Sequence, residues 1–254
     1  MSKLREHLND TARRQRGGLG FAPMKGASAS AHVLVIAEVA DAAQARSALD
    51  AGASALLCTG GPESVAAIVD VAGNAPVGCR LEAATSEQAA AIAEAKADFL
   101  LFDDGRSAAD ALLERRLGRV LLLEDGPDEE RLRMLAPLGL DAMLLPASPN
   151  TLSVRDQLRL RRIVELARAP LIIPAAGPVS TATLEVWRDA GGAAVLTAAT
   201  PPDALATLVQ AAGEVRPPRG PTGERSDATL PPTSASVIAI DEHDDDHDSE
   251  FDPI

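Results

Sequence analysis

Short apolar runs recur along the middle of the chain, and their starts lie about 21 to 29 residues apart. The clearest runs hold consecutive apolar residues rather than alternating apolar and polar positions. Continuous runs of this kind are typical of parallel strands that are buried on both faces. The pattern predicts strands that begin near residues 32, 55, 76, 98, 119, 141, 170 and 193.

A helical stretch rich in Ala, Leu, Glu and Arg follows each apolar run, and most begin after a capping or turn residue. The sequence predicts helices over residues 41–53, 62–72, 86–97, 107–117, 128–138, 153–168, 181–190 and 202–215. Eight strand–helix units favour parallel strands in a closed (β/α)8 TIM barrel. An open, doubly wound sheet is the alternative, but no glycine-rich dinucleotide loop follows the first run.

The two ends of the chain differ from this repeat, so we expect a barrel over residues 32–215 with an extension at each side. Residues 1–31 hold six bases and two acids, and residues 2–16 could form a short basic helix. Residues 216–254 hold ten acids and three bases and are rich in Pro, Ser, Thr and Gly. Such a segment buries too little apolar surface to offset its ordering entropy, which predicts a disordered acidic tail.

Composition narrows the class of protein. Hydrophobic residues make up 46% of the 254-residue chain, which is enough for a sizeable core. The net charge of −13 and the low aromatic content argue against nucleic acid as a partner. The longest apolar runs are too short for a membrane span. Two cysteines cannot form a disulfide framework, so we expect a cytoplasmic protein.

Charged residues follow the predicted strands, at the end of a barrel where active sites lie. Two similar runs 21 residues apart end in Asp103-Asp104-Gly105 and Glu124-Asp125-Gly126. Crowded carboxylates suit general acid/base catalysis or a hard cation such as Mg²⁺. We interpret Glu38, Asp103 and Glu124 as catalytic candidates and Arg80, Asp104 and Asp125 as substrate-binding candidates. The alternative is that these acids are helix caps and solvated loop residues.

Several segments resemble the aldolase-type, phosphate-binding TIM barrels, a group that includes indole-3-glycerol phosphate synthase and the flavin-dependent nitronate monooxygenases. The resembling segments are residues 36–39, 50–56, 169–177 and 189–196. The resemblance implies a phosphate cradle after the seventh and eighth strands. Its positions here include Gly177, Ser180, Thr197 and Thr200. Ala176, Pro178 and Ala198 stand at cradle positions where the group carries glycine or a backbone N–H donor.

The sequence therefore predicts an enzyme that acts on a small anionic, phosphorylated metabolite by carboxylate acid/base catalysis, as a lyase or isomerase. It predicts no dedicated metal site, and Mg²⁺ and FMN remain open as cofactors. One alternative is a non-catalytic scaffold that binds a protein partner through residues 237–254 and the basic N-terminal segment. A weaker alternative is an FMN-dependent oxidoreductase.

Overall fold

A computed structural model describes residues 2–15, 32–81, 83–149 and 152–218 of the chain. Its eight parallel strands close into a barrel in the order β1 to β8, which confirms the predicted TIM barrel and rules out the open sheet. The strands are β1 (Leu34–Val39), β2 (Ala55–Cys58), β3 (Val77–Leu81), β4 (Phe99–Phe102), β5 (Gly118–Leu122), β6 (Ala142–Leu144), β7 (Leu171–Pro174) and β8 (Gly192–Ala198). The predicted disorder of the tail and the docking segment 237–254 lie outside the described residues.

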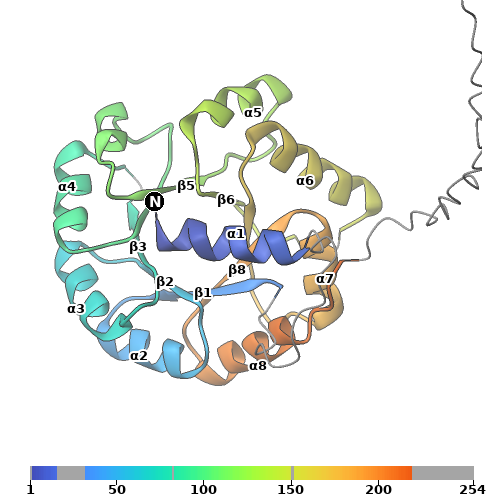
Figure 1. Ribbon diagram of the computed structural model, residues 1–254, viewed down its shortest axis with the longest axis horizontal. Coiled ribbons are helices and arrows are strands. Elements are labelled where there is room, and N and C mark those ends of the chain that lie inside the picture. The colour runs from blue at the N-terminus through green and yellow to red at the C-terminus, as the bar shows by residue number, and fades with distance from the viewer. Residues whose placement is uncertain (1, 16–31, 82, 150–151, 219–254) are drawn as a thin grey trace, which may run out of the picture. The chain divides into compact units, whose positions relative to one another are not determined.

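Helices surround the ring of strands (Figure 1). They are α2 (Ala42–Asp50), α3 (Pro62–Ala72), α4 (Ser86–Glu94), α5 (Glu129–Leu135), α6 (Val154–Ala167), α7 (Thr181–Asp189) and α8 (Pro202–Gly213), with the short turns η1 (Ala109–Leu113) and η2 (Ala136–Leu138). Side-chain caps begin several of them, and Thr85 forms a full capping box with Gln88 at α4. None of the described helices is long and apolar enough to cross a membrane.

The segment between β4 and β5 departs from the sequence prediction. We expected a helix over residues 107–117, but only the 3₁₀ turn η1 forms there. A hydrogen bond to the distant Ala84 at one end and a local hydrogen bond at the other compete with the helix. The Ser107 hydroxyl accepts from the Ala84 N–H, and the Glu114 carboxylate accepts from the Arg116 N–H at 2.9 Å.

Side chains alternate along each strand between the barrel interior and the surrounding helices. Apolar residues fill the interior, including Ile36 on β1, Leu57 on β2 and Phe99 on β4. Gly78 on β3 is the small partner of Phe99, because a Cβ there would lie 2.1 Å from the Phe99 ring. The interior is therefore a packed core, and ligand space must be sought at the ends of the barrel.

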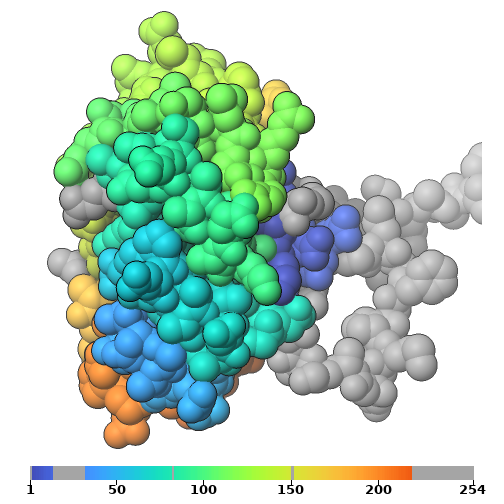
Figure 2. Space-filling view, turned by 90° about the vertical axis from the view of Figure 1, so that its left-hand side faces the viewer, coloured from blue at the N-terminus to red at the C-terminus, as the bar shows by residue number. Residues whose placement is uncertain are grey.

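Helix α1 (Lys3–Gln15) closes the amino-terminal end of the barrel. It crosses the ring of strands in Figure 1, and Figure 2 shows it on one side of the ring only. Leu4 and Leu8 are buried and belong to the same apolar cluster as the barrel interior. Asp98, which precedes β4, accepts from the backbone N–H groups of Lys3 and Leu4 at 2.8 and 2.9 Å. This carboxylate therefore caps the helix and fixes where it begins.

A second carboxylate holds α1 in place. Asp141, just before β6, is buried and accepts a hydrogen bond from the Ser2 hydroxyl. Its other oxygen lies 2.5 Å from Nε of Arg5. The sequence placed residues 1–31 outside the barrel, whereas α1 packs against the strand ends. With this end closed, the open end is the one formed by the carboxyl termini of the strands.

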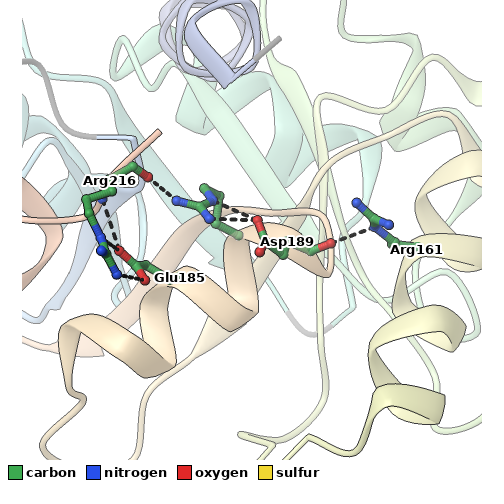
Figure 3. A network of polar contacts seen from close by, with 5 residues as sticks. Arg161, Glu185, Asp189 and Arg216 are labelled. Carbon is green, nitrogen blue, oxygen red and sulfur yellow. Dashed lines mark hydrogen bonds and ion pairs between the residues drawn. The ribbon is translucent and has the colours of Figure 1, made fainter. Parts of the chain in front are cut away.

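Contacts after α8 continue the packing beyond Val215, which is itself buried. Figure 3 shows a network of polar contacts around α7. Arg216 donates from Nε to Glu185 at 2.8 Å, and the buried Arg188 donates from Nη2 to Asp189 at 2.7 Å. Arg161 of α6 donates to the Asp189 backbone carbonyl at 2.7 Å. The chain through Arg216 is thus tied to the outer layer of helices.

Candidate functional site

A cavity of about 680 Å³ opens at the carboxyl-terminal end of the barrel. Its walls come from the ends of β1, β3 and β5 to β8 and from the first turns of α8. Most of the lining is apolar, with Leu122, Leu144, Leu145, Val179, Leu196 and Leu208 among its residues. Its size and apolar walls are typical of small-molecule sites in proteins.

Glu38 and Arg80 are the charged residues among those that line this cavity. Glu38 follows the inward-facing Leu34 and Ile36 on β1, and Arg80 follows the inward-facing Gly78 on β3, so alternation directs both side chains to the open end. Nη1 of Arg80 lies 3.1 Å from Oε1 of Glu38. The side chains are 37% and 27% exposed, respectively.

The ion pair leaves hydrogen-bonding capacity unused. Nε of Arg80 and Oε1 of Glu38 are buried atoms without a hydrogen-bond partner among the described residues. The close approach of Oε1 to Nη1 is therefore an ion pair without the alignment of a hydrogen bond. Buried polar atoms are nearly always hydrogen-bonded, so an unpaired donor and acceptor beside a cavity point to a ligand.

The loops after β7 and β8 form the opposite wall. Gly177, Thr197 and Thr200 line the cavity together with Glu38 and Arg80. Ser180 does not line it, because its hydroxyl caps α7 by accepting from the Thr183 N–H at 3.2 Å. The structure therefore gathers three of the four predicted cradle residues at one cavity.

The acidic residues after β4 and β5 do not form the crowded cluster of carboxylates that the sequence predicts. Arg131, from the first turns of α5, pairs with Asp104 and also donates from Nε to Glu124 at 3.3 Å. Asp103 accepts from the Gly105 N–H at 2.8 Å, as in an Asx turn. Glu124 and Asp125 line a separate cavity of about 470 Å³ between α5 and α6. Asp104 and Glu124 thus share Arg131 as a counter-ion, and Asp103 is engaged in its own turn.

The sequence analysis did not include Arg131. The helix that follows β5 begins at the carboxyl-terminal end of the barrel, so a cation in its first turns lies near the strand ends. Asp103 lies nearer to the main site, since it lines a small cavity of about 110 Å³ that also contacts Arg80. Among the described residues, no group of three or more His, Cys, Asp or Glu side chains is arranged to hold a metal ion. The donor set around Arg131 therefore does not fit Mg²⁺.

The two cysteines lie outside this site. Cys58 on β2 and Cys79 on β3 are register partners that point toward the helices and are fully buried. Both thiols lie near the Gly60 carbonyl, at 3.8 and 3.3 Å. Burial raises the pKa of Cys79 to about 12 and also raises that of Cys58, so both stay protonated near neutral pH. They pack as small apolar groups rather than as nucleophiles.

Comparison with known proteins supports the fold. No family model and no curated protein sequence matches the chain. A solved structure of tryptophan synthase from M. tuberculosis, in its aminoacrylate- and BRD0059-bound form, superposes with a TM-score of 0.60 at 13% identity. The match covers 84% of this chain and 97% of that one.

The aminoacrylate-bound form of tryptophan synthase from M. tuberculosis gives a TM-score of 0.57 at 15% identity, covering 85% of this chain and 98% of that one. At identities this low, the two superpositions show a shared TIM-barrel fold alone. This agrees with the fold that the resemblance in the sequence implies. The narrower likeness to indole-3-glycerol phosphate synthase and the nitronate monooxygenases stays a prediction.

Proposed function

We propose that this barrel is an enzyme that acts on a small anionic metabolite by proton transfer, as a lyase or isomerase. Arg80 binds the anionic group, and Glu38 is the general acid/base. The observation that carries the proposal is the Glu38–Arg80 pair in the cavity, with unused hydrogen-bonding capacity on both partners. Its position at the carboxyl ends of the strands is where TIM-barrel enzymes place their chemistry.

The geometry supports a simple division of labour. A substrate anion that approaches Arg80 competes with Glu38 for the guanidinium, and the freed carboxylate then lies beside the bound anion. Glu38 can take a proton from the carbon next to a carbonyl or carboxyl group of the substrate. The C–H electron pair moves into that carbonyl or carboxyl group, and Arg80 stabilises the charge that develops on oxygen.

Two outcomes then balance the reaction. Glu38 returns the proton to a different atom of the substrate, which is an isomerisation, or a leaving group departs from the neighbouring carbon and takes the proton, which is an elimination. Leu144, Pro174 and Leu196 line the cavity with apolar surface, which lowers the local dielectric. The lower local dielectric strengthens the interaction between Arg80 and the developing charge.

Solvent-proton exchange tests this proposal without knowledge of the substrate. We would incubate the protein in D₂O with small carboxylates and phosphate esters and follow C–H to C–D exchange by NMR. We expect Glu38→Gln to abolish exchange but keep binding, and Arg80→Gln to weaken both. The matched control is Glu87→Gln, which changes an exposed carboxylate in the first turn of α4.

The alternative acidic sector is tested by the double variant Asp103→Asn with Glu124→Gln. Loss of exchange in that variant together with full exchange in Glu38→Gln would move the catalytic base to β4 and β5. Absence of binding and of exchange across the whole panel would contradict the enzyme proposal. That result would favour the scaffold reading of the chain.

A further inference from the structure

We infer that the cavity lined by Glu38 and Arg80 binds a carboxylate attached to an apolar group in preference to a phosphate ester. This inference rests on the proposed function and narrows its substrate class. The inference starts from the backbone N–H groups of the loops after β7 and β8, which form the wall opposite Arg80. Phosphate sites at this place in a barrel depend on free N–H groups after β7, after β8 and at the following helix N-terminus. Each of these donors can be traced here.

The loop after β7 has few N–H groups to offer. The Ala175 N–H donates to the Leu196 carbonyl of β8 at 2.8 Å, so the barrel sheet already uses it. Pro174 and Pro178, on either side of the loop, have no N–H. Only Ala176 and Gly177 remain between them to contact a ligand.

The loop after β8 is depleted in the same way. The Ala199 N–H donates to the Glu38 carbonyl at 3.0 Å. Helix α8 is capped by Pro201 and begins with Pro202, so its first two positions have no N–H. The Ala204 N–H turns back to the Pro201 carbonyl at 3.2 Å. A helix N-terminus normally offers four free donors, and this one keeps few.

Charge points in the same direction. Asp203 is an exposed acid in the first turn of α8, where its negative charge already interacts favourably with the helix N-terminus. Within the cavity lining, Glu38 is the acid and Arg80 is the cation. A phosphate monoester carries about −1.5 to −2 at pH 7. One guanidinium balances the charge of a carboxylate, whereas a phosphate dianion brings a further negative charge beside Glu38.

Apart from Thr197, Thr200 and Thr207, the remaining lining is apolar and suits an apolar body. Its apolar residues include Leu144, Leu145, Val179, Leu196 and Leu208. An aryl or branched alkyl group attached to a carboxylate would bury its surface there while the carboxylate reaches Arg80. The guanidinium matches a carboxylate in a two-pronged hydrogen-bonding geometry.

Matched probes test the inference on the full-length protein. We would measure Kd by isothermal titration calorimetry for phenylacetate, benzylphosphonate and the neutral phenylacetamide. We expect phenylacetate to bind at least about 10-fold more tightly than either of the other two, since each loses a charged hydrogen bond or faces added repulsion. Arg80→Gln should weaken phenylacetate by a similar factor.

A gain-of-function variant gives the sharper test. Pro202→Ala with Asp203→Ser restores an N–H to α8 and removes the negative charge from its first turn. We expect this variant to bind benzylphosphonate at least about 10-fold more tightly than the unchanged protein does, with phenylacetate affinity kept within about 2-fold. Retained phenylacetate affinity shows at the same time that the variant is folded.

The outcomes separate this inference from the proposed function. Benzylphosphonate that binds the unchanged protein as tightly as phenylacetate, and loses affinity in Arg80→Gln, would overturn the carboxylate preference and leave the anion site in place. Phenylacetate binding that does not respond to Arg80→Gln would overturn both. Absence of binding by all three probes would also overturn the inference of an apolar carboxylate site.

Discussion

Replacing Leu8 by alanine should measure how strongly α1 closes the amino-terminal end of the barrel. Leu8 is 2% exposed and packs with the interior residues of the strands. Leu-to-Ala changes at buried sites cost about 2–5 kcal/mol of unfolding free energy, depending on how far the site collapses. Since α1 is a terminal helix that can settle onto the strand ends, we expect a loss of about 3 kcal/mol. For a domain of this size that lowers Tm by about 6–12 °C.

Thermal melts and urea titrations followed by far-UV circular dichroism provide the assay. Leu113→Ala is the matched control, because Leu113 is 76% exposed and should change stability by no more than about 0.5 kcal/mol. Asp98→Ala should cost about 1 kcal/mol by removing the cap of α1. A Tm for Leu8→Ala within about 1 °C of the unchanged protein would refute the reasoning, since it would mean that α1 adds no stability to the core.

Two further predictions concern titratable groups. Cys58 and Cys79 should resist iodoacetamide at pH 8 and react once urea unfolds the barrel, because burial raises both pKa values; mass spectrometry counts the labels, and rapid labelling of the folded protein would contradict this. Arg116 lowers the pKa of Glu114 from 4.5 to about 2 through hydrogen bonds, so its contribution to stability is present above pH 4.5 and lost as the pH falls toward 2. Glu114→Gln should therefore flatten the dependence of Tm on pH in that window, and an unchanged slope would contradict the assignment.

The barrel was predictable because its signal is local and repeated. Each buried strand shows as a continuous apolar run, and each crossover helix follows within a spacing that leaves room for little else. The packing of α1 was not predictable in this way. The sequence shows a basic helix with Leu4 and Leu8 on one face, but its anchors are remote. Asp98 and Asp141 lie 94 and 139 residues away from the groups that they bind.

The site was predictable only in part. The sequence shows which side chains of a strand face the barrel interior, but it does not show which side chains from different elements pair with each other. Alternation from Ile36 and Gly78 directs Glu38 and Arg80 inward, so their presence at the open end follows from the sequence. The repeated acidic motif at Asp104 and Glu124 looks like a catalytic cluster until Arg131 is placed between its members. That cation comes from a helix, and its reach depends on how α5 packs rather than on any spacing in the chain.

The wall opposite Arg80 shows why a shared barrel does not carry its ligand with it. Small residues after β7 and β8 produce the resemblance to phosphate-binding barrels, yet anion binding depends on which N–H groups are free. Pro178, Pro201 and Pro202 remove donors in a way that the sequence shows directly. The sheet removes others, and only the structure shows that Ala175 and Ala199 are already bonded. The two losses act on one wall of one cavity, and for this reason we propose that Arg80 is the group that binds the anion and that the charge of the ligand is the property to test.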